Sequence, residues 1–139
     1  MDNHYVLSMR EHTQLIVSEL RGLNSIIVER SLSRYEYRAA ERTLQILIEA
    51  CIGISKHWNK SLFGVSPADA YASFKRLEEK NIPEVVNVNW RAIVGMRNAL
   101  VHDYLNIDQQ TVEHIIKHEN YIDLKAFADA GLDYLSKNK

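Results

Sequence analysis

The residues best suited to chemistry in this sequence stand close together between positions 97 and 104. Asn98 follows Arg97 directly, and His102 and Tyr104 lie further along the same segment. A guanidinium stays charged at physiological pH and pairs with two oxygens of a carboxylate or phosphate. Histidine changes charge near neutral pH and can take up or release a proton. The group therefore combines a fixed cation with a proton carrier, as acid–base chemistry on an anionic substrate requires.

The segment that carries these residues is predicted to be a helix. Between Trp90 and Tyr104 there is no proline, and apolar residues recur at helical spacing. On such a helix Arg97 and Tyr104 project into the middle of the apolar arc, so the arginine needs a carboxylate, a phosphate or an open cleft opposite it. His102 points to a different side. We expect either a helix that frays at His102 or two copies of the segment that combine across a twofold dimer interface.

The string Arg-Asn-x-x-Val-His-x-Tyr over residues 97–104 resembles the signature of HEPN-domain proteins. With its added tyrosine it is similar to HepT, the toxin family of a two-gene toxin–antitoxin system, and the resemblance covers nearly the whole chain. It implies a metal-independent endoribonuclease toxin that uses no cofactor. Arg97 would stabilise the charged transition state, and His102 would move the proton of the attacking 2′-hydroxyl or of the leaving oxygen. The resemblance also places Asn98 in the active site.

The resemblance implies two protein partners as well as an RNA substrate. One motif supplies one histidine, whereas separate acid and base roles use two, so a homodimer that faces its motifs together is expected. The second partner is an MntA-type nucleotidyltransferase antitoxin, which would attach AMP to Tyr104 and silence the toxin. Messenger RNA and transfer RNA both remain open as substrates.

Each motif residue also has a purely structural interpretation. Arg97 could pair with a carboxylate such as Glu49, His102 could be a residue favoured by the dipole at a helix end, and Tyr104 could fill the edge of the core. A competing function is a non-catalytic helical adaptor that binds and positions a nucleotidyltransferase through Arg97 and Tyr104. The presence of all the motif residues together favours the nuclease.

Composition sets the class of protein. The chain has 139 residues, 46% of them hydrophobic, and is expected to form one compact domain over residues 1–139. The resemblance implies that this domain is HEPN-like and helical. The formal net charge of −1 means that RNA must be held by a local patch. Cys51 is the only cysteine, and no apolar run reaches the length of a membrane span. We therefore expect a cytoplasmic protein with no membrane contact.

The spacing of apolar residues predicts an all-α fold, an up-down four-helix bundle with an additional short helix. Ser66 is expected to cap the short helix and Asp108 the last one. Gly22 lies inside the first helix and predicts a close approach of a neighbouring helix there. Five helices are predicted in all, over residues 6–27, 37–58, 66–80, 83–104 and 108–134.

A row of arginines could hold a phosphate backbone if one helix ran through all of them. Interleaved carboxylates at Glu29, Glu36 and Glu41 would neutralise such a row, so a solvated helix face is the favoured interpretation. The arginines recur at every fourth residue: Arg30, Arg34, Arg38 and Arg42.

His114 and His118 have the spacing of two metal ligands on one helix. No third ligand stands at metal-site spacing, and we expect no metal.

Overall fold

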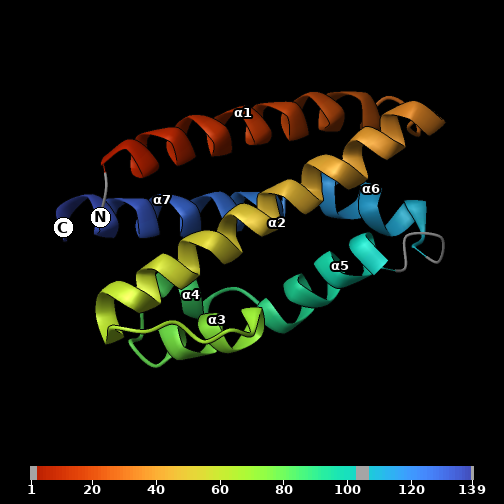
Figure 1. Cartoon of the computed structure of the whole chain (residues 1–139). Helices are drawn as coiled ribbons and strands as arrows, with labels where there is room; N and C mark the ends of the chain where they lie inside the picture. The colour runs from red at the N-terminus through yellow and green to blue at the C-terminus, as the bar shows by residue number, and fades with distance from the viewer. Residues whose placement is uncertain (1–2, 103–106, 139) are drawn as a thin grey trace.

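The computed structural model describes residues 3–102 and 107–138, and within them every regular element is an α-helix. The all-α fold is therefore confirmed. The helices follow in the order α1 (Asn3–Ile27), α2 (Arg34–Phe63), α3 (Ala70–Glu78), α4 (Pro83–Val86), α5 (Trp90–His102), α6 (Gln109–Lys117) and α7 (Tyr121–Lys137), as drawn in Figure 1.

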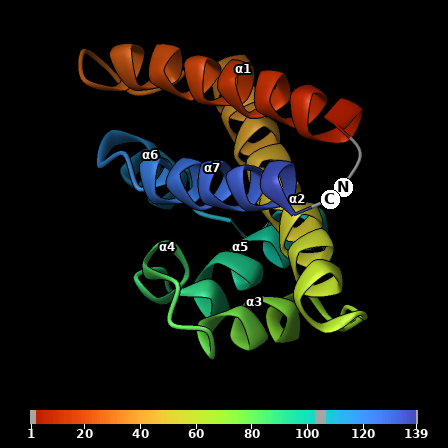
Figure 2. The same cartoon turned by 90° about the vertical axis from the view of Figure 1, so that its left-hand side faces the viewer.

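Helix α2 is the centre of the arrangement. Figure 2 shows α1 above, α6 and α7 in the middle and α3 to α5 below, with α2 crossing all three levels. One face of α2 packs on α1 and α7, and another packs on α3 and α5. The side chains between them form one continuous apolar core, in which Leu20, Leu47 and Phe127 have no exposed surface. This core holds α5, the helix that carries the predicted site.

The ends of α2 are set by local sequence. Ser33 accepts a hydrogen bond from the backbone N–H of Glu36, and the Glu36 carboxylate accepts one from the backbone N–H of Ser33. This reciprocal capping box starts the helix three residues before the predicted position 37. At the other end Gly64 adopts a left-handed conformation, with φ of 81°, which glycine tolerates without strain. The helix thus runs five residues beyond the predicted end at 58.

The helix predicted from Pro83 through the motif is divided, so this prediction was wrong in its first part. Residues Pro83–Val86 form the short α4, and α5 begins anew at Trp90. The Asn89 side chain accepts a hydrogen bond from the backbone N–H of Ala92 and so caps the new helix. The indole N–H of Trp90 donates to the carbonyl oxygen of Val85, which fixes the bend between the two helices.

Three other predictions of local structure are corrected. The last predicted helix is split into α6 and α7, because Glu119 takes a left-handed conformation with φ of 56° between them. The short helix α3 is capped by Asp69, whose carboxylate accepts from Ala72 N–H, and Ser66 lies outside it. Gly22 makes no close helix contact: a side chain there would meet no atom within 4 Å.

The close helix–helix approach occurs instead at Gly131 in α7. A Cβ atom at this position would lie 2.5 Å from Ile54 Cγ2 and 3.0 Å from Trp58 Cε3, both on α2. The missing side chain therefore sets the distance between α2 and α7. Within the described residues, no helix has both the length and the apolar composition needed to cross a membrane.

Candidate active site

The first turn of α5 is fixed by an aromatic cluster. The Trp90 ring stacks on Phe74 of α3 with 3.8 Å between centroids, and it meets Phe127 of α7 edge-on at 4.7 Å. All three side chains are buried, and such pairs add to the stabilisation from burial alone. Because the indole also donates to Val85, both the position and the rotation of the start of α5 are determined.

The predicted catalytic residues all lie in the second half of α5. Arg97 is half-buried on the side of α5 that faces the core, whereas Asn98 and His102 are exposed. The guanidinium Nε of Arg97 donates a 2.8 Å hydrogen bond to Asn98 Oδ1. The side chain of Asn98 therefore holds the Arg97 guanidinium at the border between the buried side and the exposed side of α5.

Asn98 and His102 share one face of α5. They are one turn apart, about 40° around the helix axis, whereas Arg97 and His102 are separated by about 140°. The bond to Asn98 draws the guanidinium toward the face that His102 occupies. The structure thus joins Arg97 to Asn98 and places His102 next to Asn98, but it shows no hydrogen bond from His102 to either residue.

Two of the alternative interpretations are wrong. His102 is itself helical, as the last residue of α5, and so it stays on a different side of the helix from Arg97. Glu49 accepts a hydrogen bond from Gln45 at 2.7 Å, and within the described residues Arg97 forms no salt bridge. The remaining expectation is that a second copy completes the site. Tyr104, the predicted site of AMP attachment, lies outside the described residues.

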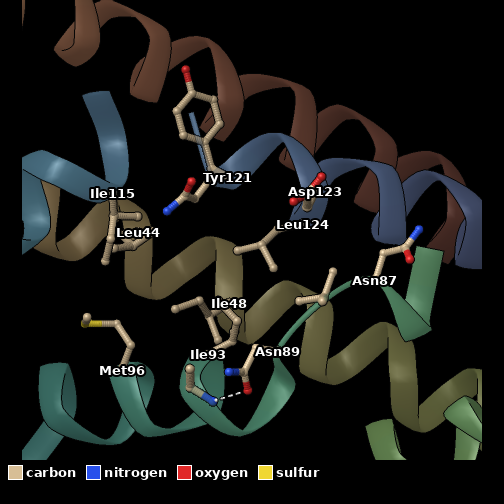
Figure 3. Close-up of a pocket in the computed structure, with 13 residues that line it drawn as sticks. Leu44, Ile48, Asn87, Asn89, Ile93, Met96, Ile115, Tyr121, Asp123 and Leu124 are labelled. Atoms are coloured by element: carbon tan, nitrogen blue, oxygen red, sulfur yellow. Dashed lines mark hydrogen bonds between the residues drawn. The ribbon is translucent and has the colours of Figure 1, made fainter. Parts of the chain in front are cut away.

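A cavity of about 300 Å³ opens on the other side of α5, and the sequence pattern did not reveal it. Figure 3 shows apolar side chains of α2, α5, α6 and α7 around it, among them Leu44, Met96 and Ile115. Met96 and His102 are about 120° apart around the α5 axis, so the cavity lies away from the exposed motif residues. It belongs to the packing between helices and not to the Asn98–His102 face.

His114 of α6 and His118, the residue that caps the end of this helix, lie side by side. The ring centroids of His114 and His118 are 4.1 Å apart. Within residues 3–102 and 107–138, no group of three or more histidine, cysteine or acidic side chains could hold a metal ion.

Comparisons with known proteins agree with this fold and with the family resemblance of the sequence. A profile of the family described as Ribonuclease HepT-like matches residues 9–130. The mRNA nuclease HepT of Shewanella oneidensis is 34% identical over 87 residues, which cover 58% of this chain and 65% of that protein, a little less than two thirds of its length. A chain from the crystal structure of a toxin–antitoxin with AMP-PNP superposes with a TM-score of 0.76 over 94% of this chain and 99% of that one, at 23% identity. The chain belongs to the Ribonuclease HepT-like family.

Proposed function

We propose that this protein is a metal-independent endoribonuclease, the toxin of a bacterial toxin–antitoxin pair, whose site is formed by Arg97, Asn98 and His102. The observation that carries the proposal is the hydrogen bond that holds the Arg97 guanidinium beside Asn98, one turn from an exposed histidine. A structural arginine of this kind is normally paired with a carboxylate. Membership of the Ribonuclease HepT-like family supports the same assignment.

The chemistry requires one proton acceptor, one proton donor and one cation. An imidazole removes the proton of a ribose 2′-hydroxyl, and the 2′-oxygen forms a bond to the adjacent phosphorus. The bond from phosphorus to the 5′-oxygen breaks, and this oxygen takes a proton from a second imidazole. Arg97 pairs with the phosphoryl oxygens while negative charge develops on them. The products carry a 2′,3′-cyclic phosphate and a 5′-hydroxyl, and no step needs a metal.

A homodimer supplies the two imidazoles. Each chain offers one His102 on the exposed face of α5, next to Val101, which is itself 39% exposed. A twofold axis beside this face would bring two copies of Asn98 and His102 to a single phosphate.

Control of the nuclease would act through Tyr104. In the proposed reaction the tyrosine hydroxyl gives up its proton to solvent or to a base of a nucleotidyltransferase antitoxin. Its oxygen forms a bond to the α-phosphorus of ATP, and the bond to pyrophosphate, the leaving group, breaks. The AMP phosphate would then compete with the substrate phosphate for Arg97. The family resemblance of the 97–104 string supports this step. We further propose that the chain acts in the cytoplasm as one HEPN-like domain over residues 1–139.

The test is cleavage of total bacterial RNA in EDTA by the purified protein, with analysis of the fragment ends. We expect the unsubstituted protein to produce 2′,3′-cyclic ends, and Arg97→Ala and His102→Ala to be inactive while circular dichroism shows them folded. His12→Ala, an exposed histidine on α1, is the matched control and should cleave normally.

Cleavage that persists in His102→Ala, or that stops in EDTA, would contradict the proposal. Mass analysis of Tyr104 decides the case in which no variant cleaves. An AMP group on Tyr104 would show a silenced sample, which phosphodiesterase treatment should reactivate. An unmodified, inactive protein that binds a nucleotidyltransferase would establish the adaptor function in its place.

A further inference from the structure

The first half of α2 exposes a basic face with an aromatic residue at its end. Tyr35 has 87% of its surface exposed, more than any other large hydrophobic residue in the described part of the chain. The side chains of Arg34, Arg38 and Arg42 are exposed on the same part of the helix. We call these four residues the α2 arginine face. The helix does not run through Arg30, which precedes it, so the face is shorter than the row seen in sequence.

The carboxylate of Glu36, which lies between Arg34 and Arg38 in the sequence, has another partner. Glu36 accepts hydrogen bonds from both terminal nitrogens of Arg30, at 2.7 and 2.9 Å, and from the backbone N–H of Ser33. These contacts lower the pKa of Glu36 to about 2, so its charge is held by Arg30. Glu36 is therefore part of the helix cap and does not neutralise Arg34 or Arg38.

Glu41 and Glu29 form no salt bridge with these arginines within the described residues. Burial, followed by the charge of Glu41, raises the pKa of Tyr37 to about 12. Glu29 lies in the turn before α2. Within residues 3–102 and 107–138, none of the three arginines forms a salt bridge. The arginine side chains are exposed, as expected of a solvated face, but none of the interleaved carboxylates forms a salt bridge with them within the described residues.

The arginine face lies at the same end of the molecule as the proposed site. Leu44 and Met96 line one cavity, and from there α2 and α5 run antiparallel, as Figure 1 shows. Arg42 is two residues before Leu44, and Asn98 is two residues after Met96. Arg42 and Asn98 each lie about 160° around their helix axis from the cavity residue, so neither side chain points into the cavity, and both are exposed. Helices α1 and α7 pack on another side of α2.

The geometry points to a binding surface for single-stranded RNA, which extends the proposed function by naming how the strand is held. Successive arginines four residues apart rise about 6 Å along α2, a step suited to successive phosphates of an extended strand. The exposed ring of Tyr35 at the end of this row offers a stacking platform for a base. A formal net charge of −1 makes such a local patch necessary for binding a polyanion.

The first experiment measures binding to a 2′-O-methylated single-stranded RNA, which cannot be cleaved, by fluorescence anisotropy at several salt concentrations. The triple variant Arg34→Gln, Arg38→Gln, Arg42→Gln should bind more weakly. Each lost phosphate contact reduces the magnitude of the slope of log K against log salt by about 0.7, so the triple variant should show a slope that is shallower by about 2. The matched control removes three exposed lysines on other surfaces: Lys60→Gln, Lys75→Gln and Lys117→Gln. It should keep the slope of the unsubstituted protein.

The second experiment separates stacking from charge. Tyr35→Ala should weaken binding at least about fivefold with no change in salt slope, and Tyr35→Phe should restore it. Equal binding by the arginine triple variant and the unsubstituted protein overturns the inference, and so does an equal loss in the lysine control. A triple variant that binds RNA normally but changes its mass in light scattering would instead show a protein interface.

Failure of this inference is distinguishable from failure of the nuclease proposal. A dinucleoside monophosphate has a single phosphodiester. This group would bind at the Arg97 site and would leave the α2 arginine face empty. The arginine triple variant should cleave it at the normal rate while losing activity on long RNA. A slower reaction on the short substrate would contradict a separate binding surface. A protein that cleaves nothing but binds the methylated strand through α2 would refute only the nuclease.

Discussion

Replacing Gly131 by alanine should destabilise the protein, although alanine is the better helix former. The added Cβ would lie 2.5 Å from Ile54 Cγ2, about 1 Å closer than an ordinary contact between carbon atoms. Ile54 is β-branched and has no exposed surface, and Trp58 is packed against Phe127 and Tyr134. Neither side chain can yield easily, so α7 must move away from α2.

The expected size follows from two opposing effects. Overpacking a core by a methyl group costs about 1–3 kcal/mol, and the gain in helix propensity returns about 1 kcal/mol. We expect Gly131→Ala to lose up to about 2 kcal/mol of unfolding free energy. Gly22→Ala is the matched control, because it makes the same change on α1 where no atom lies within 4 Å. It should gain about 0.5–1 kcal/mol.

The assay is urea unfolding followed by circular dichroism, at one protein concentration because dimerisation would shift the midpoint. Ile54→Ala removes the atom that the new methyl group meets. The double variant with Gly131→Ala should therefore be more stable than the sum of the two single changes predicts. A Gly131→Ala variant as stable as Gly22→Ala, or strict additivity in the double variant, would refute the reasoning.

Three further predictions concern single side chains. Because Arg30 lowers the pKa of Glu36 to about 2, the stabilisation from this pair should be complete above pH 4.5 and should disappear as the pH falls toward 2. NMR titration measures the pKa of Glu36, and Glu36→Gln should remove this pH dependence of stability. Burial raises the pKa of the Cys51 thiol, so a thiol reagent should label it only as fast as the chain unfolds. Ser73→Ala breaks the buried 2.7 Å hydrogen bond to Ser55 and should cost about 1–3 kcal/mol in urea unfolding, less when Ser55→Ala is added.

The long helices were predictable because their apolar residues recur at helical spacing and few glycines or prolines interrupt them. The breaks inside the predicted helices were not. The division between α4 and α5 depends on the Trp90 indole reaching the Val85 carbonyl, which is a contact in space. The division between α6 and α7 depends on a left-handed Glu119, and glutamate gives no sequence signal for that conformation.

The identity of the candidate site residues came from the motif, but their relation to one another did not. Spacing on a helix correctly separated Arg97 from His102. It could not show that Asn98 holds the Arg97 guanidinium, because a bond between adjacent residues on a helix depends on side-chain rotamers. Likewise, sequence proximity suggested that Glu36 neutralises the arginines of α2, whereas the capping box turns its carboxylate to Arg30.

The aromatic cluster at the start of α5 sets the direction of the whole helix, so a small tilt there displaces the far end of α5. Trp90 is clamped between Phe74 and Phe127, and His102 lies twelve residues away, about 18 Å along the axis. A tilt of about 3° at the clamp would displace His102 by about 1 Å, which is enough to reduce a catalytic rate about a hundredfold. Substitutions that repack this cluster should therefore impair the proposed reaction from a distance, although none of them replaces a residue next to His102.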